Sequence, residues 1–316
     1  MKTSCEICKN ALDNSTHLAR EMMFGMRDPF TYMECGACGC LQNISVPNDL
    51  SKYYGNNYYS VISDVLKRRP VYDRIKQIRT KTYLTRKGSL GTLLLKKFGV
   101  PGLPSWVVRA GMHQESQILE VGCGTGSLLL SLRSEGFSNL TGADPFIETD
   151  IDYGRGLRIL KSYIPEIPGR YDFIVLEHAF EHIPKPHETL EALRSLLEPN
   201  GTLIISIPLA SYAWKHYGVN WVQLDAPRHL FLHTEESFRI LTKQMTITEV
   251  RYDSNAVQFW GSEQYKRNIH LLDDRSYRIN PKNSIFSREE MMEFSDRARI
   301  LNEQRMGDQA TFYLRR

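Results

Sequence analysis

Four cysteines near the N-terminus have the spacing of metal ligands. They form two pairs, Cys5 with Cys8 and Cys35 with Cys38, and 26 residues separate the pairs. Four thiolates close a tetrahedral shell around Zn²⁺ and leave no coordination position for water, so the pattern predicts a structural zinc ribbon. The alternative is a pair of redox-active disulfides, which would require the βαβ surroundings of a thioredoxin-like protein.

A glycine-rich turn follows Gln117–Val121, whose composition predicts a strand. The turn contains three glycines at alternate positions: Gly122, Gly124 and Gly126. Glycines let a backbone turn tightly and approach a ligand where a side chain would collide. Glu120 precedes the first glycine by two positions, and Asp144 ends the next predicted strand, Leu140–Asp144. The two acids make this pattern more specific than a bare glycine turn, which nicotinamide and flavin enzymes also contain.

This acid–glycine pattern resembles the first motif of class I methyltransferases, which use S-adenosylmethionine (SAM). The resemblance implies that the glycines lie against the amino-acid part of SAM. It also implies that Asp144 accepts hydrogen bonds from both ribose hydroxyls and that Phe146 flanks the adenine. The predicted donor-site residues are Glu120, Gly122, Cys123, Gly124, Gly126, Asp144, Pro145, Phe146 and Glu177.

A histidine-containing segment follows the strand-like residues Phe173–Glu177. His178, Glu181 and His182 match the H-x-x-E-H pattern of an inverted zinc-protease motif. That chemistry requires both histidines on one helical face, whereas two prolines follow here, so the pattern predicts a loop between a strand and a helix. The loop resembles the one after the fourth strand of small-molecule and sugar methyltransferases. His182 is a candidate general base there.

A second group of polar and aromatic side chains follows the fifth predicted strand. Aromatic faces and directed hydrogen bonds suit a sugar or nucleotide acceptor. We expect Asp225 to orient His229 or Arg228, and His229, the first candidate base, to take the proton of an acceptor hydroxyl. The alternative is a structural Arg–Asp pair with a packed histidine. The predicted catalytic residues are therefore His229, His182 and Asp225. The predicted acceptor-binding residues are Arg228, Trp214, Tyr217, Trp221, His178 and Tyr265.

Strand and helix patterns alternate as in a doubly wound sheet. The resemblance implies a Rossmann-like, seven-stranded class I methyltransferase sheet. Strands are predicted at Gln117–Val121, Leu140–Asp144, Asp172–Glu177, Thr202–Ile207, Thr246–Tyr252 and Ala310–Leu314. Helices are predicted at Ser63–Arg86, Ser127–Leu132 and Pro186–Leu197, after the N-cap Thr234, and after the capping box that starts at Ser287.

These elements suggest three consecutive domains. Residues 1–45 form the zinc ribbon, 46–110 a basic helical linker, and 111–316 the SAM-binding domain. Segment 253–309 is inserted between the last two strands. Because both of its ends are expected at the ligand-binding rim of the sheet, we predict that this insertion covers the active site, with Gly261–Tyr265 in its roof.

Composition narrows the class of protein. A hydrophobic content of 41% and a charged content of 24% are usual for a soluble globular protein. No run approaches the roughly 20 apolar residues of a membrane span, and no secretion signal precedes the first cysteine, so we expect a cytoplasmic protein. Thirteen Lys and Arg against two Asp between residues 51 and 110 indicate either a solvated linker or a surface for phosphates. Such a surface would bind a nucleotide diphosphate, an anionic membrane or RNA.

The motifs in this order resemble those of methyltransferases from surface-polysaccharide and sugar-modification clusters. The resemblance implies SAM as donor and a nucleotide- or lipid-linked sugar or glycan precursor as acceptor. Deoxysugar C-methyltransferases share the ribbon but usually carry a larger C-terminal domain than this insertion, which favours oxygen as the methylated atom and leaves sugar C-methylation as an alternative. RNA methylation is the main rival function, and the chain has no Asn-Pro-Pro-Tyr-like or proline–cysteine motif after the fourth strand. A SAM-binding scaffold without activity is the third alternative.

Overall fold

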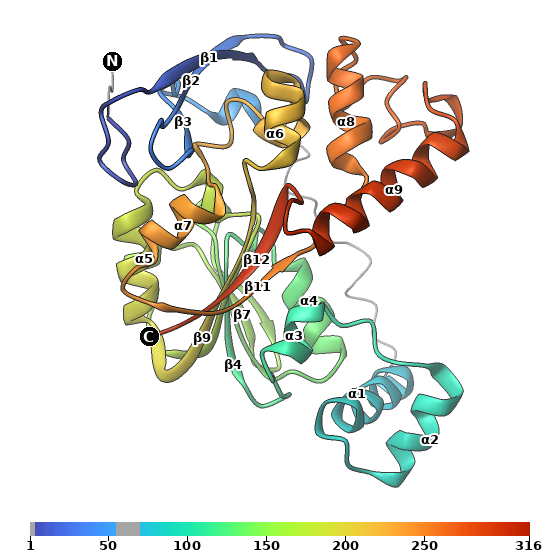
Figure 1. The fold of residues 1–316 in the computed structure, drawn as a ribbon. Coiled ribbons are helices and arrows are strands. Elements are labelled where there is room, and N and C mark those ends of the chain that lie inside the picture. Colours follow the sequence, from blue (N-terminus) through green and yellow to red (C-terminus); the bar gives the residue numbers. More distant parts are fainter. Residues whose placement is uncertain (1–3, 55–69) are drawn as a thin grey trace. The chain divides into compact units, whose positions relative to one another are not determined.

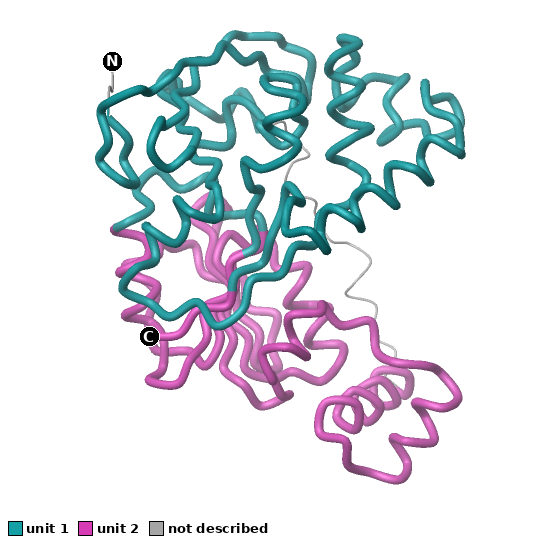
Figure 2. Tube along the Cα trace, viewed as in Figure 1, with its two compact units in different colours: residues 1–55, 178–187, 206–312 teal, residues 56–177, 188–205, 313–316 magenta. Residues whose placement is uncertain are grey.

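The computed structural model describes residues 4–54 and 70–316, which form two compact units (Figures 1 and 2). Unit 1 comprises residues 1–55, 178–187 and 206–312, and unit 2 comprises residues 56–177, 188–205 and 313–316. Each unit therefore takes its residues from separated stretches of the chain. This division differs from the three consecutive domains that the sequence suggested.

Unit 2 is centred on parallel strands. Strand β4 (Gln117–Val121) pairs in parallel with β5 (Asn139–Ala143) and with β8 (Tyr171–Glu177). On the far side of β5 lies β7 (Leu157–Leu160), again parallel, and β7 pairs antiparallel with β6 (Ile151–Gly154). Because β4 and β5 are parallel neighbours, the turns that follow them lie at the same edge of the sheet.

The complete sheet has eight strands in the order β11-β12-β9-β8-β4-β5-β7-β6 (Figure 1). Its other members are β9 (Leu197–Pro208), β11 (Thr246–Tyr252) and β12 (Gln309–Arg315). This is the Rossmann-like methyltransferase fold that the sequence predicted, with eight strands in place of seven. The β6–β7 hairpin is absent from the predicted strands, because its two four-residue strands are too short to give a clear periodicity.

Strand β9 begins earlier than predicted. It runs through Pro199, Asn200 and Gly201, whose residue types predicted a turn. A Cβ atom on Gly201 would lie 3.0 Å from the carbonyl oxygens of both Glu198 and Tyr171. The glycine therefore permits close approach of two backbone segments instead of ending the element.

Five helices begin within or next to unit 2. They are α1 (Pro70–Thr85), α2 (Ser89–Phe98), α3 (Ser105–Arg109), α4 (Ser127–Ser134) and α5 (Pro186–Ser195). The predicted helix 63–86 corresponds to α1, and its residues before 70 lie outside the described residues, as does the Tyr58–Tyr59 part of the linker. Some of the basic charge of this region is structural, because Lys76 and Arg79 lie 3.6 and 3.9 Å from the buried Glu135 carboxylate.

Unit 1 contains the cysteine-rich segment. Strands β1 (Ser15–Arg20), β2 (Pro29–Glu34) and β3 (Leu41–Asn43) form an antiparallel sheet, and the two-residue strand β10 (Phe231–Leu232) pairs with β3. The fourth strand comes from a segment almost 190 residues further along the chain. The N-terminal sheet is thus completed by the region that carries His229.

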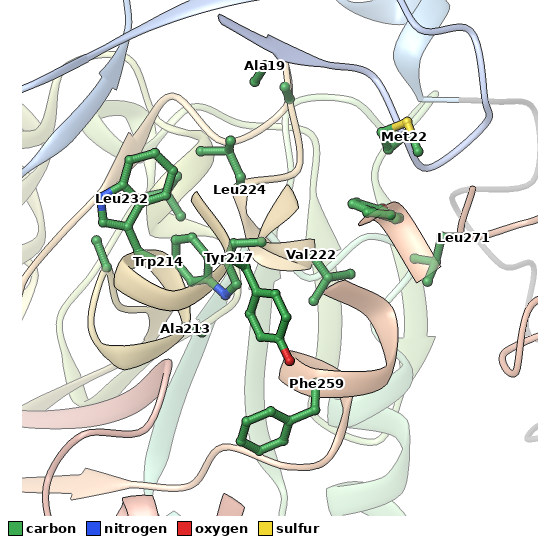
Figure 3. Packing of buried hydrophobic residues seen from close by; sticks show 14 of the residues in the cluster. Ala19, Met22, Ala213, Trp214, Tyr217, Val222, Leu224, Leu232, Phe259 and Leu271 are labelled. Carbon is green, nitrogen blue, oxygen red and sulfur yellow. The ribbon is translucent and has the colours of Figure 1, made fainter. Parts of the chain in front are cut away.

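One hydrophobic core joins three segments of unit 1 (Figure 3). Ala19 and Met22 come from the N-terminal segment, Tyr217 from α6 (Tyr212–Tyr217), and Phe259 from α8 (Val257–Lys266). The helix α9 (Arg288–Glu303) adds three buried residues to this core: Phe294, Ala298 and Leu301. The inserted segment therefore packs together with the cysteine-rich segment.

Two predicted helix starts in unit 1 are confirmed by their caps. The Thr234 hydroxyl accepts a hydrogen bond from the Ser237 amide at the start of α7 (Glu235–Leu241), and Ser287 does the same for Glu290 at the start of α9. Short 3₁₀ turns lie at Ser51–Tyr53, Ile164–Glu166, Phe180–His182, Gly218–Asn220, Val222–Leu224 and Pro281–Asn283. Across residues 4–54 and 70–316, every helix is too short or too polar to span a bilayer.

Candidate functional site

The glycine turn of unit 2 has a backbone that excludes side chains. Gly122, Gly124 and Gly126 have φ angles of 75°, 54° and 84°, in the left-handed region that favours glycine. A Cβ atom on Gly126 would lie 2.6 Å from Cδ1 of Ile159. The first glycine of the turn is anchored to the neighbouring strand, because the Gly122 amide donates a 2.8 Å hydrogen bond to the carbonyl of Ala143.

Asp144 lies opposite this turn and is held by backbone donors. Its Oδ2 accepts a hydrogen bond from the Gly124 amide at 2.9 Å, and its Oδ1 accepts one from the Phe146 amide, also at 2.9 Å. A carboxylate oxygen accepts more than one hydrogen bond, so both oxygens keep capacity for ligand hydroxyls. Pro145 separates Asp144 from Phe146, whose ring is 71% exposed. The roles of Asp144 at a ribose and of Phe146 at an adenine stay predictions.

Glu120 makes the same region acidic. Its side chain is buried, and among the described residues its Oε2 has no hydrogen-bond partner. Burial raises the pKa of Glu120 to about 8, and the carboxylates of Glu177 and Asp144 add to this rise. Burial, followed by the charge of Glu120, also raises the pKa of the Cys123 thiol. A cationic ligand would relieve the repulsion among these carboxylates.

Unit 1 contains a separate cluster of Glu181, His182 and His229. One ligand atom from each residue lies within 4.8 Å of the others, and the two imidazole ring centroids are 4.8 Å apart. Glu181 is 1% exposed, and among the described residues neither of its carboxylate oxygens has a hydrogen-bond partner. The ring nitrogens His178 Nδ1 and His229 Nε2 lie 3.6 and 3.9 Å from Oε1.

Backbone carbonyls fix the orientation of both histidines. His182 Nδ1 lies 2.9 Å from the Arg228 carbonyl oxygen, and His229 Nδ1 lies 2.8 Å from that of Gln223. Because a carbonyl only accepts, each Nδ1 carries a proton, and the lone pair of the neutral form of either ring lies on Nε2. Burial, together with the neighbouring His182, lowers the pKa of His229 to about 4, so His229 is neutral at pH 7.

Asp225 orients Arg228 and not His229. Arg228 donates two hydrogen bonds to the Asp225 carboxylate, at 2.8 and 2.5 Å, while His229 Nε2 is 3.8 Å from Asp225. Arg228 is fully buried and also donates to the Tyr53 carbonyl at 2.8 Å. Burial opposes the ionisation of Asp225, but Arg228 outweighs it and lowers the pKa of Asp225 to about 2. Of the two expected partners of Asp225, the structure shows Arg228, and the Gln223 carbonyl fixes the His229 ring instead.

Two residues around this cluster have left-handed backbones. His178 has a φ of 52° and Asp225 a φ of 41°, values that non-glycine residues adopt rarely. His178 directly follows Glu177, the last residue of β8, and Asp225 precedes the buried Arg228. Strained backbones of this kind concentrate at functional sites, where the surrounding contacts hold them in place.

The aromatic residues proposed to bind the acceptor lie in the core of unit 1 (Figure 3). Trp221 is 0% exposed and donates to Asp308 Oδ2 at 2.8 Å, and Trp214 donates to Glu34 Oε1 at 3.2 Å. Tyr217 and Tyr265 are also buried. Aromatic density predicts core packing as well as a binding surface, and packing is what this structure shows. A role of these side chains in stacking on an acceptor stays a prediction.

The four cysteines of the two pairs converge as thiols. Cys5 Sγ lies 3.7 Å from Cys38 Sγ, and Cys8 Sγ lies 3.5 Å from Cys35 Sγ, with all four sulfurs within 4.8 Å. A disulfide requires about 2.05 Å, so the redox-disulfide alternative does not describe this arrangement. A tetrahedron of Zn–S bonds of about 2.3 Å places its sulfurs about 3.8 Å apart. The cluster has the dimensions of a four-thiolate metal site.

Comparison with known proteins identifies a methyltransferase domain in this chain. Residues 96–245 match the family model described as a methyltransferase domain. The ubiquinone biosynthesis O-methyltransferase of Cronobacter sakazakii is 28% identical over 109 residues, which cover 31% of this chain and 44% of that protein. The protein of the same name from Serratia proteamaculans is 29% identical and covers 31% and 45%. The chain spans less than half the length of these curated relatives.

Solved structures that this chain matches include a cyclopropane synthase from Mycobacterium tuberculosis, with a TM-score of 0.42 and 16% identity, covering 78% of this chain and 94% of that one. Coclaurine N-methyltransferase gives a TM-score of 0.42 and 14% identity, with 79% and 90% covered. The matched residues 96–245 include the glycine turn, Asp144 and the His182–His229 cluster, but not the four cysteines or the insertion. The chain contains a methyltransferase domain.

Proposed function

We propose that the protein transfers the methyl group of SAM to a hydroxyl oxygen of a nucleotide- or lipid-linked sugar or glycan precursor. One observation carries the donor half: Glu120, Asp144 and Glu177 place three carboxylates around a turn of three left-handed glycines. SAM is cationic at its sulfonium and its ammonium group, so this group of acidic residues attracts it by charge. Asp144, with both oxygens already fixed by amides, is preorganised for the two ribose hydroxyls.

The reaction requires one proton to leave the acceptor. The acceptor oxygen attacks the methyl carbon, a C–O bond forms and the C–S bond breaks. The sulfonium becomes a neutral thioether in S-adenosylhomocysteine. The hydroxyl proton passes to a base, either an imidazole of the histidine cluster or a base assisted by a cation, as inferred below. His182 is half-buried and His229 only 8% exposed, so His182 is the more accessible imidazole. A positioned base contributes typically about 10²–10⁴-fold.

Oxygen as the acceptor atom has support from outside the site. The curated relatives are named O-methyltransferases, and their similarity covers 28–31% of this chain. The order of the motifs, from the cysteine pairs to the histidine cluster, supports a sugar-linked acceptor. The function rests on these two supports together with the donor pocket.

A labelled-methyl assay tests this function. The full chain is incubated with methyl-labelled SAM and a panel of nucleotide sugars and lipid-linked sugars, with total RNA added as competitor. We expect the label in a sugar fraction, no label in RNA, and loss of transfer in the Asp144→Ala variant. Label that appears only in RNA would establish the rival function instead.

We also propose that Cys5, Cys8, Cys35 and Cys38 hold a structural zinc ion. The four sulfurs leave no position for water, so this ion would support the N-terminal sheet and take no part in methyl transfer. Elemental analysis should show one zinc fewer per chain in Cys5→Ser than in the natural chain. Cys40→Ser is the matched control, because Cys40 is buried nearby but outside the four-sulfur cluster, and it should keep the ion. Four freely titratable thiols in zinc-free natural protein would contradict the proposal.

A further inference from the structure

Among the described residues, the buried Glu181 carboxylate of unit 1 lacks the hydrogen-bond donors that a buried carboxylate normally has. It is 1% exposed, and in the part of the chain that the structure describes both of its oxygens lack a hydrogen-bond partner. A carboxylate without donors is costly to bury, so a native structure normally supplies a counter-charge. We propose that Glu181, His182 and His229 bind a divalent transition-metal ion, at a site separate from the four cysteines.

The distances of the three residues fit such an ion. One ligand atom from each lies within 4.8 Å of the others, and His229 Nε2 is 3.9 Å from Glu181 Oε1. Zinc bonds to imidazole nitrogen and carboxylate oxygen are about 2.0–2.2 Å long, which places two tetrahedral ligands about 3.4 Å apart. Small side-chain rotations therefore close the cluster around an ion.

The outer hydrogen bonds are those that metal-binding histidines make. A ligating histidine usually donates its other ring N–H to a carbonyl or carboxylate, which fixes the ring and directs the lone pair at the metal. Here His182 and His229 both donate Nδ1–H to backbone carbonyls, of Arg228 and Gln223. With Nδ1 protonated, each neutral ring carries its lone pair on Nε2, and the Glu181 carboxylate lies beside the two rings as a third, anionic ligand.

The simpler alternative is that Glu181 only pairs with a protonated His178. His178 Nδ1 is 3.6 Å from Oε1, beyond hydrogen-bond distance, and Oε2 is left without a donor in the described structure. A single ion at the centre of the three residues would serve Glu181 and both imidazoles at once. The geometry favours the ion.

The donor set indicates which ion binds. Two imidazoles and one carboxylate suit Zn²⁺, Fe²⁺ or Mn²⁺, whereas Mg²⁺ and Ca²⁺ prefer oxygen ligands throughout. Three protein ligands leave further positions open for oxygen donors. If the proposed function holds, an acceptor hydroxyl occupies one of them, and the cation lowers its pKa so that the proton leaves to a base more readily.

Manganese binding tests the site without any assay of activity. Mn²⁺ is a suitable probe because four thiolates prefer zinc, so the cysteine cluster does not compete for it. Zinc-replete protein is titrated with Mn²⁺, and free Mn²⁺ is followed by its electron paramagnetic resonance signal. We expect one Mn²⁺ per chain, with affinity at least about tenfold weaker in Glu181→Gln and in His182→Gln.

Matched controls come from an exposed pair elsewhere in the chain. His113 Nδ1 lies 3.3 Å from Glu115 Oε2, and both side chains are exposed, so His113→Gln and Glu115→Gln should bind Mn²⁺ like the natural chain. Circular dichroism shows which variants are folded. If Glu181→Gln does not fold, the result for His182→Gln decides the test of the site. Equal binding by a folded cluster variant, or no binding by the natural chain, would overturn the site. Binding without methyl transfer would refute only the proposed function.

Discussion

Glu120 and Glu181 are both buried glutamates, and their environments shift their pKa values in opposite directions. Glu120 faces the carboxylates of Glu177 and Asp144, and burial with this repulsion raises its pKa to about 8. Glu181 is more deeply buried, but the imidazoles of His178, His182 and His229 outweigh burial and lower its pKa. The first therefore holds a proton at neutral pH, and the second holds a negative charge.

The difference shows that burial alone does not set the charge of a glutamate, because the neighbouring groups reinforce burial at Glu120 and outweigh it at Glu181. An acidic pocket that keeps a proton releases it when a cation arrives, which suits a sulfonium ligand. An ionised carboxylate beside two oriented imidazoles can bind a metal ion, or it can stabilise an imidazole that accepts a proton during the reaction. Each side of the comparison can be changed separately, because Glu120 belongs to unit 2 and Glu181 to unit 1.

The largest effect on turnover is expected from substitutions in the cluster of Glu181, His182 and His229. His182→Ala should lower turnover by about 10²–10⁴-fold and leave SAM affinity unchanged, because the acceptor proton loses its route. If the cluster binds a cation, His229→Ala should show a similar loss; if one imidazole acts alone as the base, only one of the two variants should. Steady-state rates with labelled SAM distinguish these outcomes, and His113→Ala is the control. Normal turnover in both variants would remove the cluster from the reaction.

A smaller effect, on SAM affinity, is expected from a substitution in the proposed SAM site. Asp144→Ala removes two charge-assisted hydrogen bonds to SAM, each worth about 1.5–3 kcal/mol, so SAM affinity should fall at least about tenfold. Calorimetric titration measures this loss. Asp150→Ala is a suitable control, since Asp150 is an exposed acid in the same unit and bonds only to Lys161 in the described structure. Equal affinities of Asp144→Ala and the natural chain would contradict the donor assignment.

The smallest effect concerns stability and pH. Glu120 has a raised pKa in the folded chain, so the folded state binds more protons than the unfolded state between pH 4.5 and about 8. Its contribution to stability is complete below pH 4.5 and is lost as pH rises through about 8, by up to about 1.4 kcal/mol per pH unit. Chemical unfolding of ligand-free Glu120→Gln should lack this decline.

The difference between the natural chain and Glu120→Gln isolates this residue from other groups. His229, whose pKa is lowered to about 4, contributes in the opposite direction below pH 6.5 in both proteins. Asp144, Glu177 and Cys123, which surround Glu120, are likewise common to both. Parallel stability curves between pH 5 and 8 would show that Glu120 is ionised in the folded chain.

The geometry of the glycine turn was predictable from sequence, because its requirements are local. Three glycines, a preceding acid and an acid at the end of the next strand are all set by positions within one βαβ unit. The orientation of His229 was not predictable from sequence. It depends on the main-chain carbonyl of Gln223, and every residue type has such a carbonyl. Glu181 was visible in the H-x-x-E-H pattern, but only the structure shows that it is buried without a donor.

The core of unit 1 escaped prediction for a different reason. Trp221 and Phe259 pack with Met22, and β10 completes the N-terminal sheet, although these segments are far apart in sequence. Periodicity identifies the apolar face of one element, but it does not show which distant face covers it. The sequence therefore predicted consecutive domains where the structure has a core assembled from three segments.

Calorimetric titration of SAM at pH 7 in two buffers of different ionisation enthalpy tests the central claim most directly. With a pKa of about 8, Glu120 is about nine-tenths protonated at this pH. The account predicts binding of one SAM per chain with release of nearly one proton, seen as an enthalpy that depends on the buffer. In Glu120→Gln that dependence should disappear. Absence of SAM binding to the folded natural chain, or binding with the same enthalpy in both buffers, would contradict it.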